Sequence, residues 1–185
     1  TYFILLILVF GCEEKTAKKT TTDDFIYKKP VTKEIVRPIN LTFLEKENDS
    51  IKKYYEVLGN FEIWYHKTNR QDLINEIKLS YREGLLPEDY HYKKIKALEE
   101  SRNQLSDEDI IRYDILLTRT FEKLANHLHA GKLNPKEVYT DWDIEKKEIA
   151  LSQKLKNAIK ENKMASLFKS IKPQDEIYRK IKKSL

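Results

Sequence analysis

Four histidines are the side chains in this sequence best suited to bind a metal or to transfer a proton near neutral pH. They are His66, His91, His127 and His129. His127 and His129 lie two residues apart on a predicted helix, so their side chains point to opposite sides and cannot share one metal ion. The sequence also lacks a His-Glu-x-x-His pattern, which places two histidines on one helix face. We therefore expect no metal site and no cofactor in this chain.

Asp114 is the acid with the most unusual position. It lies four residues after Ile110 and three before Leu117, so it falls on or beside the apolar stripe of a predicted helix. A carboxylate there needs hydrogen-bond partners or a shifted pKa. We interpret Asp114 as a buried acceptor for a tyrosine, an arginine or a backbone group. The alternative is the catalytic acid of a stand-alone hydrolase, although spacing places no second acid to complete a glycosidase pair.

The sequence offers no recognisable nucleophile for covalent catalysis. No serine or cysteine lies in a nucleophile-elbow context, and the only cysteine is Cys12. Four glycines, none in a Gly-rich motif, do not form a phosphate-cradling loop. A single cysteine also excludes a disulfide framework and a cysteine-based zinc or iron–sulfur site. We therefore assign no catalytic, cofactor-binding or metal-binding residue to this chain.

The elements that position these residues are predicted to be helices. Apolar residues recur every three or four positions, while Gly and Pro punctuate the pattern. We expect an all-α fold: a compact bundle of about six short helices joined by Gly/Pro corners and preceded by an extended tether. The predicted helices span 51–58, 69–84, 87–98, 106–131, a short helix from Asn134 and Pro135, 152–162 and 173–185.

An aromatic cluster follows the first predicted helix, with Phe61, Trp64 and Tyr65 around Ile63. Such a cluster can form a platform on which sugars stack. The interpretation that we favour is core packing against the first helix, because aromatic side chains contribute large buried areas.

Composition limits the classes of protein that remain. The chain has 185 residues, of which 40% are hydrophobic and 35% charged, enough apolar material for a core. A mean hydropathy of −0.67 excludes a polytopic membrane protein. The net charge is +5, with bases and acids finely mixed and no basic block, so we expect no nucleic-acid partner. A solvated surface explains this charge, and mild attraction to an acidic polymer or an anionic membrane is the alternative.

The N-terminal residues indicate where in the cell the protein is located. Residues 2–10 are apolar, too few to span a bilayer but enough for the apolar region of a signal peptide. Gly11 and Cys12 follow, directly before charged residues. This order resembles a bacterial lipoprotein signal, which is cut before the cysteine and whose cysteine is then acylated, although Val9 stands where leucine is usual. The resemblance implies that Cys12 is a lipid anchor and that the protein faces the periplasm. The alternative is a buried strand or helix containing Cys12.

Three regions are therefore predicted. Residues 1–11 are a lipoprotein signal peptide whose start is missing, and 12–48 are a lipid-anchored linker, with polar residues and prolines that favour an extended tether. Residues 49–185 are the helical domain. Because the chain does not begin with Met, we expect that it begins partway into an open reading frame or was trimmed.

Several segments of the helical region share their order and spacing with one known family. An opening set of aromatic residues consists of Tyr54, Tyr55, Phe61 and Trp64. The other segments are 73–90, which ends in Arg-Glu-Gly-Leu-Leu-Pro-Glu-Asp-Tyr, 113–118 running on to 127–135, 141–144 and 173–185. From about residue 50 to 185 the chain resembles the scaffold domain of large murein L,D-transpeptidases, although Glu-Ile stands where Pro-Ala often precedes the tryptophan.

The resemblance implies a role without chemistry in this part of the protein. In that family a YkuD-type catalytic domain, with a histidine and a Ser-x-Gly-Cys nucleophile, joins peptidoglycan stem peptides by 3→3 cross-links. This chain has neither motif, so no catalytic residue is carried over. The resemblance implies that the chain is the N-terminal portion of such an enzyme, cut at both ends. The implied partners are peptidoglycan, the catalytic domain and, through the lipid, a membrane. The alternative is a stand-alone helical envelope lipoprotein that binds a wall or protein partner. The sequence does not indicate an oligomeric state.

Overall fold

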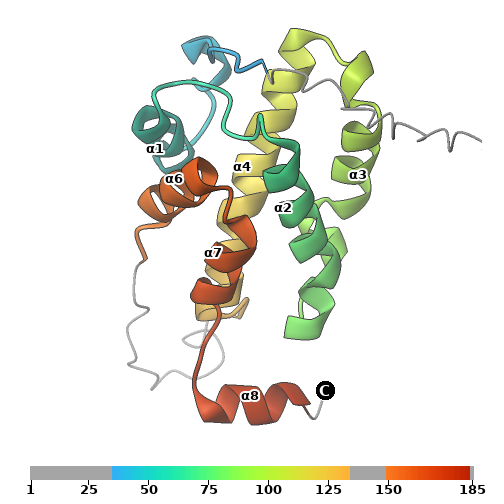
Figure 1. The fold of residues 1–185 in the computed structure, drawn as a ribbon, viewed down its shortest axis with the longest axis vertical. Helices are drawn as coiled ribbons and strands as arrows, with labels where there is room; N and C mark the ends of the chain where they lie inside the picture. The colour runs from blue at the N-terminus through green and yellow to red at the C-terminus, as the bar shows by residue number, and fades with distance from the viewer. Residues whose placement is uncertain (1–34, 134–148, 184–185) are drawn as a thin grey trace, which may run out of the picture. The chain divides into compact units, whose positions relative to one another are not determined.

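The computed structural model describes residues 35–133 and 149–183, and within these ranges the chain is helical and has no β-strand (Figure 1). One antiparallel bridge pairs Pro38 with Phe61. The predicted all-α fold is therefore confirmed. The α-helices of the described ranges are α1 (Asp49–Leu58), α2 (Lys67–Leu79), α3 (Tyr92–Glu100), α4 (Asp107–Ala130), α6 (Leu151–Glu161), α7 (Met164–Ile171) and α8 (Glu176–Lys183).

The longest helix, α4, begins and ends close to the residues that the sequence signals predict. The Ser106 hydroxyl accepts a hydrogen bond from the Asp109 backbone N–H at 3.1 Å, and acidic residues in the first turn suit the positive end of the helix dipole. Gly131 follows the last helical residue with a φ of +80°, which glycine adopts without steric cost. The predicted apolar stripe of α4 is buried along its length: Ile110, Tyr113, Leu117, Phe121, Leu124 and Leu128.

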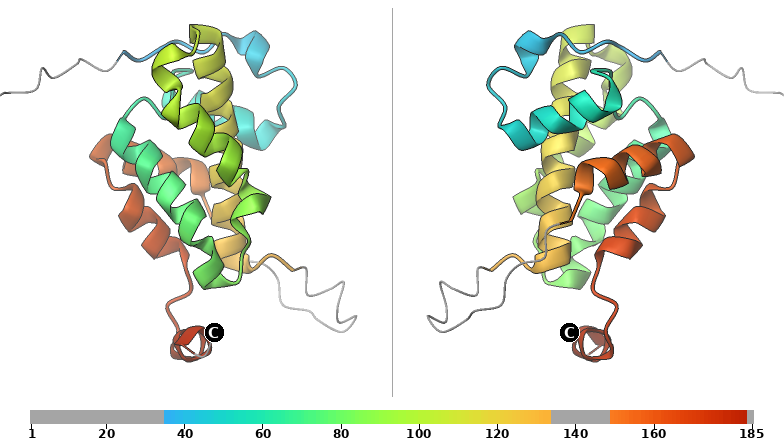
Figure 2. Two further views of the ribbon diagram at one scale, coloured as in Figure 1. Left: turned by 90° about the vertical axis from the view of Figure 1, so that its right-hand side faces the viewer. Right: turned by 90° about the vertical axis from the view of Figure 1, so that its left-hand side faces the viewer.

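All the described helices except α8 are arranged around α4. Helices α1, α2, α3 and α7 contact it directly, while α6 packs against α1 and α7 (Figure 1, Figure 2). Phe121 lies where these helices meet. Its ring makes edge contacts with Tyr54 of α1 and Phe168 of α7, at centroid distances of 6.1 and 5.8 Å, and a tilted contact with Trp64 at 5.9 Å. One aromatic cluster therefore joins three helices and the segment between α1 and α2.

The aromatic segment after α1 is largely core, as the favoured interpretation states. Ile63 and Trp64 are 1% exposed, whereas the Phe61 ring is 48% exposed at the edge of the body. The buried members pack in the same core cluster as α1 and α4. A sugar-stacking platform built on Trp64 is therefore excluded, because its ring is covered.

Helix α2 differs from its prediction at both ends. It begins at Lys67 rather than after a cap at Asn69, and Asn69 is buried within its first turns. At the other end the α-helix stops at Leu79 and continues as a 3₁₀ turn, Ser80–Glu83, before Gly84. Tyr81 lies in this turn and is 56% exposed. The change from 3.6 to 3 residues per turn rotates Tyr81 away from the core.

Two further elements differ from the prediction. A helix was expected from Pro87, but Pro87–Tyr90 forms a 3₁₀ turn, and His91 with a φ of +56° separates it from α3. Helix α7, Met164–Ile171, lies between the last two predicted helices and was not predicted. The short helix α7 fits the same periodicity rule, since its buried residues are Met164, Leu167, Phe168 and Ile171.

The described end of the predicted linker is packed on the helical body. Ile39 and Leu44 are buried, and Asn40 caps a 3₁₀ turn at Leu41–Phe43. These described residues therefore pack together with the helices that follow them. We refer to residues 37–47 as the N-terminal strap. The local sequence of the strap is polar, so its two inward-facing apolar residues were read as part of a tether.

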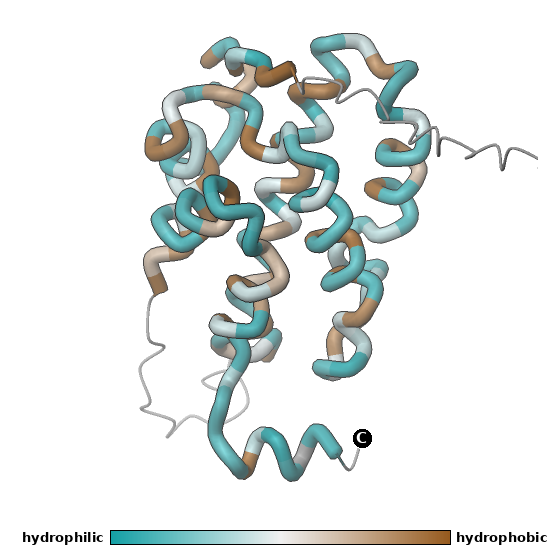
Figure 3. Tube along the Cα trace, viewed as in Figure 1, coloured by the Kyte–Doolittle hydropathy of each residue, from teal (hydrophilic) through white to brown (hydrophobic). Residues whose placement is uncertain are grey.

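Some predictions fall outside the described residues. These are the signal peptide, Cys12, most of the linker and the short helix from Asn134 and Pro135. Among the helices that the structure describes, none is both long and apolar enough to cross a membrane. Along these helices hydrophilic residues alternate with shorter groups of hydrophobic ones, as the hydropathy colouring of Figure 3 shows.

Candidate functional site

Asp114 is the centre of a buried polar network between α4 and the aromatic segment. Its side chain is in the interior, and both carboxylate oxygens are occupied. Oδ1 accepts a hydrogen bond from the Tyr55 hydroxyl at 2.8 Å, and Oδ2 accepts one from the Trp64 backbone N–H at 2.7 Å. The predicted role of Asp114 as an acceptor for a tyrosine and a backbone group is confirmed, and its burial contradicts the alternative of a hydrolase acid that contacts substrate.

Thr118, one turn further along α4, extends this network. Its hydroxyl accepts a hydrogen bond from Trp64 Nε1 at 3.0 Å and lies 3.0 Å from the Tyr55 hydroxyl. It also contacts the Asp114 carbonyl oxygen at 3.1 Å. Burial raises the pKa of Asp114 to about 7, against the opposing effect of its hydrogen bonds from Trp64 and Tyr55. The network therefore holds an ionisable group inside the fold, with no opening to solvent.

Arg70 fixes the other side of the same aromatic segment. Its Nη1 donates to the carbonyl oxygens of Trp64 and Tyr65, each at 2.7 Å, and its Nε donates to Glu99 Oε2 at 2.8 Å. Glu99 also accepts a hydrogen bond from the Tyr113 hydroxyl at 3.1 Å. Arg70 has both its charge and its backbone partners inside the body, so it orders the core rather than binding a ligand.

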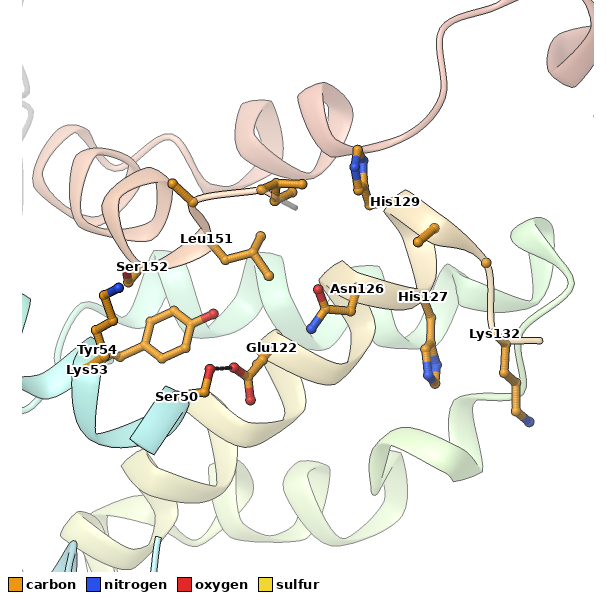
Figure 4. Close-up of a pocket in the computed structure, with 14 residues that line it drawn as sticks. Ser50, Lys53, Tyr54, Glu122, Asn126, His127, His129, Lys132, Leu151 and Ser152 are labelled. Carbon is orange, nitrogen blue, oxygen red and sulfur yellow. Dashed lines mark hydrogen bonds between the residues drawn. The ribbon is translucent and has the colours of Figure 1, made fainter. Parts of the chain in front are cut away.

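A pocket with a volume of about 840 Å³ lies where α1, the C-terminal half of α4 and the start of α6 meet (Figure 4). This volume is typical of small-molecule sites. Ser50, Lys53 and Tyr54 line it from α1, and Glu122 and Asn126 from α4. Helix α6 and the residues before it contribute Ile149, Ala150, Leu151 and Ser152. The α4 end adds His127, His129, Ala130, Gly131 and Lys132.

The polar groups of the pocket are suited to binding. The Ser50 hydroxyl donates to the Glu122 carboxylate, and the Tyr54 hydroxyl points into the space between Leu151 and Asn126 (Figure 4). Burial, together with the charge of Glu122, raises the pKa of Tyr54, which therefore remains a hydrogen-bond donor. The arrangement has hydroxyl, amide and carboxylate groups around an apolar wall, which can hold a polar ligand.

The two histidines of α4 do not act together. The His127 Nδ1 lies 2.8 Å from the Tyr90 hydroxyl, while the His129 Nδ1 lies 3.4 Å from the Ile171 carbonyl oxygen. Figure 4 shows the two rings pointing in different directions, as their spacing predicts. Within residues 35–133 and 149–183, no group of three or more His, Cys, Asp or Glu side chains is arranged to hold a metal ion.

A second groove of about 470 Å³ lies between the N-terminal strap, α3 and α4. Its floor is partly apolar, with Leu98 and Leu116, and its rim is charged. Arg119 at the rim binds Glu47 of the strap, and the Arg112 guanidinium lies 5.3 Å from the centre of the Phe43 ring. These contacts attach the strap to α4, so the two arginines at the rim of this groove stabilise the fold.

Sequence reasoning identified Asp114 but did not find the pocket. Ser50 and Glu122 are 72 residues apart, and nothing in their local sequence indicates that they meet. The only available signal was the helical periodicity, which places Lys53 and Glu122 on the borders of their apolar stripes. A pocket formed by three helices depends on how those helices pack, which spacing along one helix does not specify.

The comparisons with known proteins give one result for the helical body. The model of a family described as Scaffold domain matches residues 49–185, from the first residue of α1 onward. Neither a curated protein nor a solved structure matches the chain. The match covers well over half of the sequence, and the chain therefore belongs to the Scaffold domain family.

Proposed function

We propose that this chain is the non-catalytic scaffold region of a peptidoglycan L,D-transpeptidase. In this role the helical body supports 3→3 cross-linking of stem peptides by a catalytic domain that lies outside residues 1–185. The observation that carries the proposal is the Scaffold domain match across residues 49–185. The finer assignment to the murein enzymes rests on the resemblance of the segments around 82–90 and 127–135.

The internal use of polar groups supports a mechanical role. The segment around Trp64 is held in position by hydrogen bonds to Asp114, Thr118 and Arg70. Such satisfied networks make a body rigid and give it one arrangement. A rigid body is what a scaffold needs if it is to hold another domain at a fixed place.

The proposal includes the location of the protein. Cys12 is the proposed lipid anchor, and the helical body then lies in the periplasm beside the wall. An alternative keeps the location but removes the enzyme: a stand-alone envelope lipoprotein that binds a wall or protein partner. The polar pocket between α1, α4 and α6 favours this alternative, because its size suits a ligand of its own.

The test uses the complete product of the gene, including any residues that follow Leu185. The purified product is incubated with peptidoglycan fragments that carry tetrapeptide stems, and the products are separated and identified by mass spectrometry. We expect 3→3 cross-linked dimers from the complete product and none from residues 1–185 alone. A complete product that makes no cross-link would overturn the transpeptidase assignment and leave the stand-alone lipoprotein.

The location has its own test. Radiolabelled palmitate should label the wild-type protein in a bacterial host, and Cys12→Ser should remove the label. Label that persists in the Cys12→Ser variant would show that this residue is not the anchor.

A further inference from the structure

The charges of the described residues are divided unevenly between two parts of the chain. Residues 35–133 contain sixteen Lys and Arg against seventeen Asp and Glu, a net charge of −1 with histidine neutral. Residues 149–183, which form α6, α7 and α8, contain ten against three, a net charge of +7. The positive charge of the body is therefore concentrated on its last three helices.

Many of these basic residues are available to a partner. Six of them make no ion pair with any residue that the structure describes, and five of the six are exposed. We call these six residues the cationic surface: Lys154, Lys156, Lys160, Lys169, Arg179 and Lys183. Helices α6 and α7, which carry four of them, pack directly against each other (Figure 2).

Helix α8 is attached to the body through polar contacts. The Glu83 carboxylate of the turn after α2 accepts hydrogen bonds from the Tyr178 hydroxyl and the Lys182 ammonium, and Lys172 lies 3.2 Å from it. Lys172 also pairs with Glu76. These contacts neutralise two lysines while leaving Arg179 and Lys183 exposed, so α8 adds to the cationic surface.

The residues between these lysines indicate the kind of partner. The exposed positions of α6 and α7 that are not basic are mainly polar, including Gln153, Asn157 and Ser166. Among the side chains of residues 149–183 whose exposure the structure describes, the one large hydrophobic side chain that is strongly exposed is Ile177. A helix that binds a bilayer needs a continuous apolar face to insert, and the exposed positions of α6 and α7 do not form one. A hydrated polymer fits it better.

The basic residues of α6, α7 and α8 are mainly lysines, which suit a ligand whose negative charges are separated. Nine of the ten are lysine and one is arginine. Lysine binds anions as a point charge, whereas planar, bidentate recognition of phosphate favours arginine. The surface therefore suits a polymer with separated carboxylates better than a dense phosphate backbone.

We propose that the cationic surface of α6, α7 and α8 binds peptidoglycan through the carboxylates of its stem peptides. This inference rests on the proposed function, which supplies the polymer, and it adds the part of the scaffold that contacts it. Binding is electrostatic, so its affinity falls as salt screens the charges. It concentrates the protein on the wall without recognising one particular stem.

The experiment is co-sedimentation of the full chain with purified peptidoglycan sacculi over a range of salt concentrations. The test variant carries four reversals, Lys154→Glu, Lys160→Glu, Lys169→Glu and Arg179→Glu. The matched control carries the same change of charge elsewhere, through Lys46→Glu, Lys78→Glu, Lys93→Glu and Arg82→Glu. We expect about tenfold weaker binding for the test variant, about twofold or less for the control, and loss of wild-type binding at high salt.

Several outcomes would overturn the proposal: equal losses in both variants, binding that salt does not weaken, or tighter binding to phosphatidylglycerol vesicles or to DNA than to sacculi. Circular dichroism checks that both variants fold, and Lys→Gln and Arg→Gln changes at the same four test positions replace the reversals if they do not. Cross-linking by the complete gene product is scored separately. If the complete product makes cross-links but its binding to sacculi is insensitive to salt, only the proposal for the cationic surface is wrong. If binding depends on charge but no cross-links form, only the transpeptidase assignment is wrong.

Discussion

Residues 35–133 and residues 149–183 use charged side chains in opposite ways. In the first region acids and bases are nearly equal in number and many are paired within the fold, as Arg70 is with Glu99 and Arg37 with Glu62. In the second region bases outnumber acids by more than three to one, and most of them face solvent. The contrast suggests that the first region keeps the body rigid and that the second presents it to a partner.

The core contribution of the first region is the largest effect to test. Phe121→Ala should lower the free energy of unfolding by about 3–5 kcal/mol, because it removes a ring that contacts three other aromatic side chains and leaves a cavity. Chemical denaturation measures this change. Phe61→Ala is the control, since its half-exposed ring should cost much less, and equal costs would contradict the assigned core.

A pair of arginine variants tests the comparison itself. Arg70→Ala should cost about 2–4 kcal/mol, because it leaves Glu99 and two backbone carbonyls without their partner. Arg179→Ala, on the exposed side of α8, should change the free energy of unfolding by about 0.5 kcal/mol or less. If the two variants are equally stable in denaturation experiments, the first region does not use its charges to stabilise the fold in the way that the comparison proposes.

The buried carboxyl of Asp114 predicts a pH dependence. Its folded-state pKa of about 7 lies above that of an unfolded aspartate, so the folded state binds the proton more tightly. The free energy of unfolding should therefore fall as pH rises from about 4 to about 7, by up to about 1.4 kcal/mol per pH unit. Asp114→Asn, which cannot ionise, should remove this slope in unfolding curves measured across that range. If the slope persists in the variant, other titrating groups cause the pH dependence.

The attachment of α8 should give the smallest change in overall stability. Glu83→Gln removes the charge that holds Lys182 and Lys172, so α8 should exchange its amide hydrogens faster while α4 stays protected. We expect a loss of about 1 kcal/mol or less in global unfolding. Hydrogen exchange followed by mass spectrometry resolves the two helices. Equal acceleration in α4 would mean that Glu83 supports the whole body.

The sequence was most informative where local rules decide the structure. The cap at Ser106, the stop at Gly131 and the buried stripe between them follow from residue types and spacing alone. The role of Asp114 could also be predicted, because a carboxylate on an apolar stripe is buried and must find hydrogen-bond partners there. Its actual partners, Tyr55 and Trp64, could not be named, since they lie 59 and 50 residues away in the sequence and spacing along one helix does not specify how distant segments pack.

Predictions were weakest where a short segment depends on its neighbours. Ile39 and Leu44 were placed in a linker because the sequence around them is polar, yet each fills a gap in the body. Helix α7 was missed although its buried residues follow the helical period, because no capping side chain marks its start at Lys163. The charge of the C-terminal helices was also hidden, since the net +5 of the whole chain averages over regions of opposite character.

The bridge between the N-terminal strap and the aromatic segment has a mechanical consequence. The Ile39 N–H donates to the Asn60 carbonyl oxygen and the Glu62 N–H donates to the Arg37 carbonyl oxygen, each at 2.8 Å. Tension applied to the chain before Ile35 is carried first by these two bonds and by the ion pairs of Arg37 with Glu62 and Asp107. The strap therefore passes a pull from the N-terminal side to two places in the body, the aromatic segment and the first residue of α4.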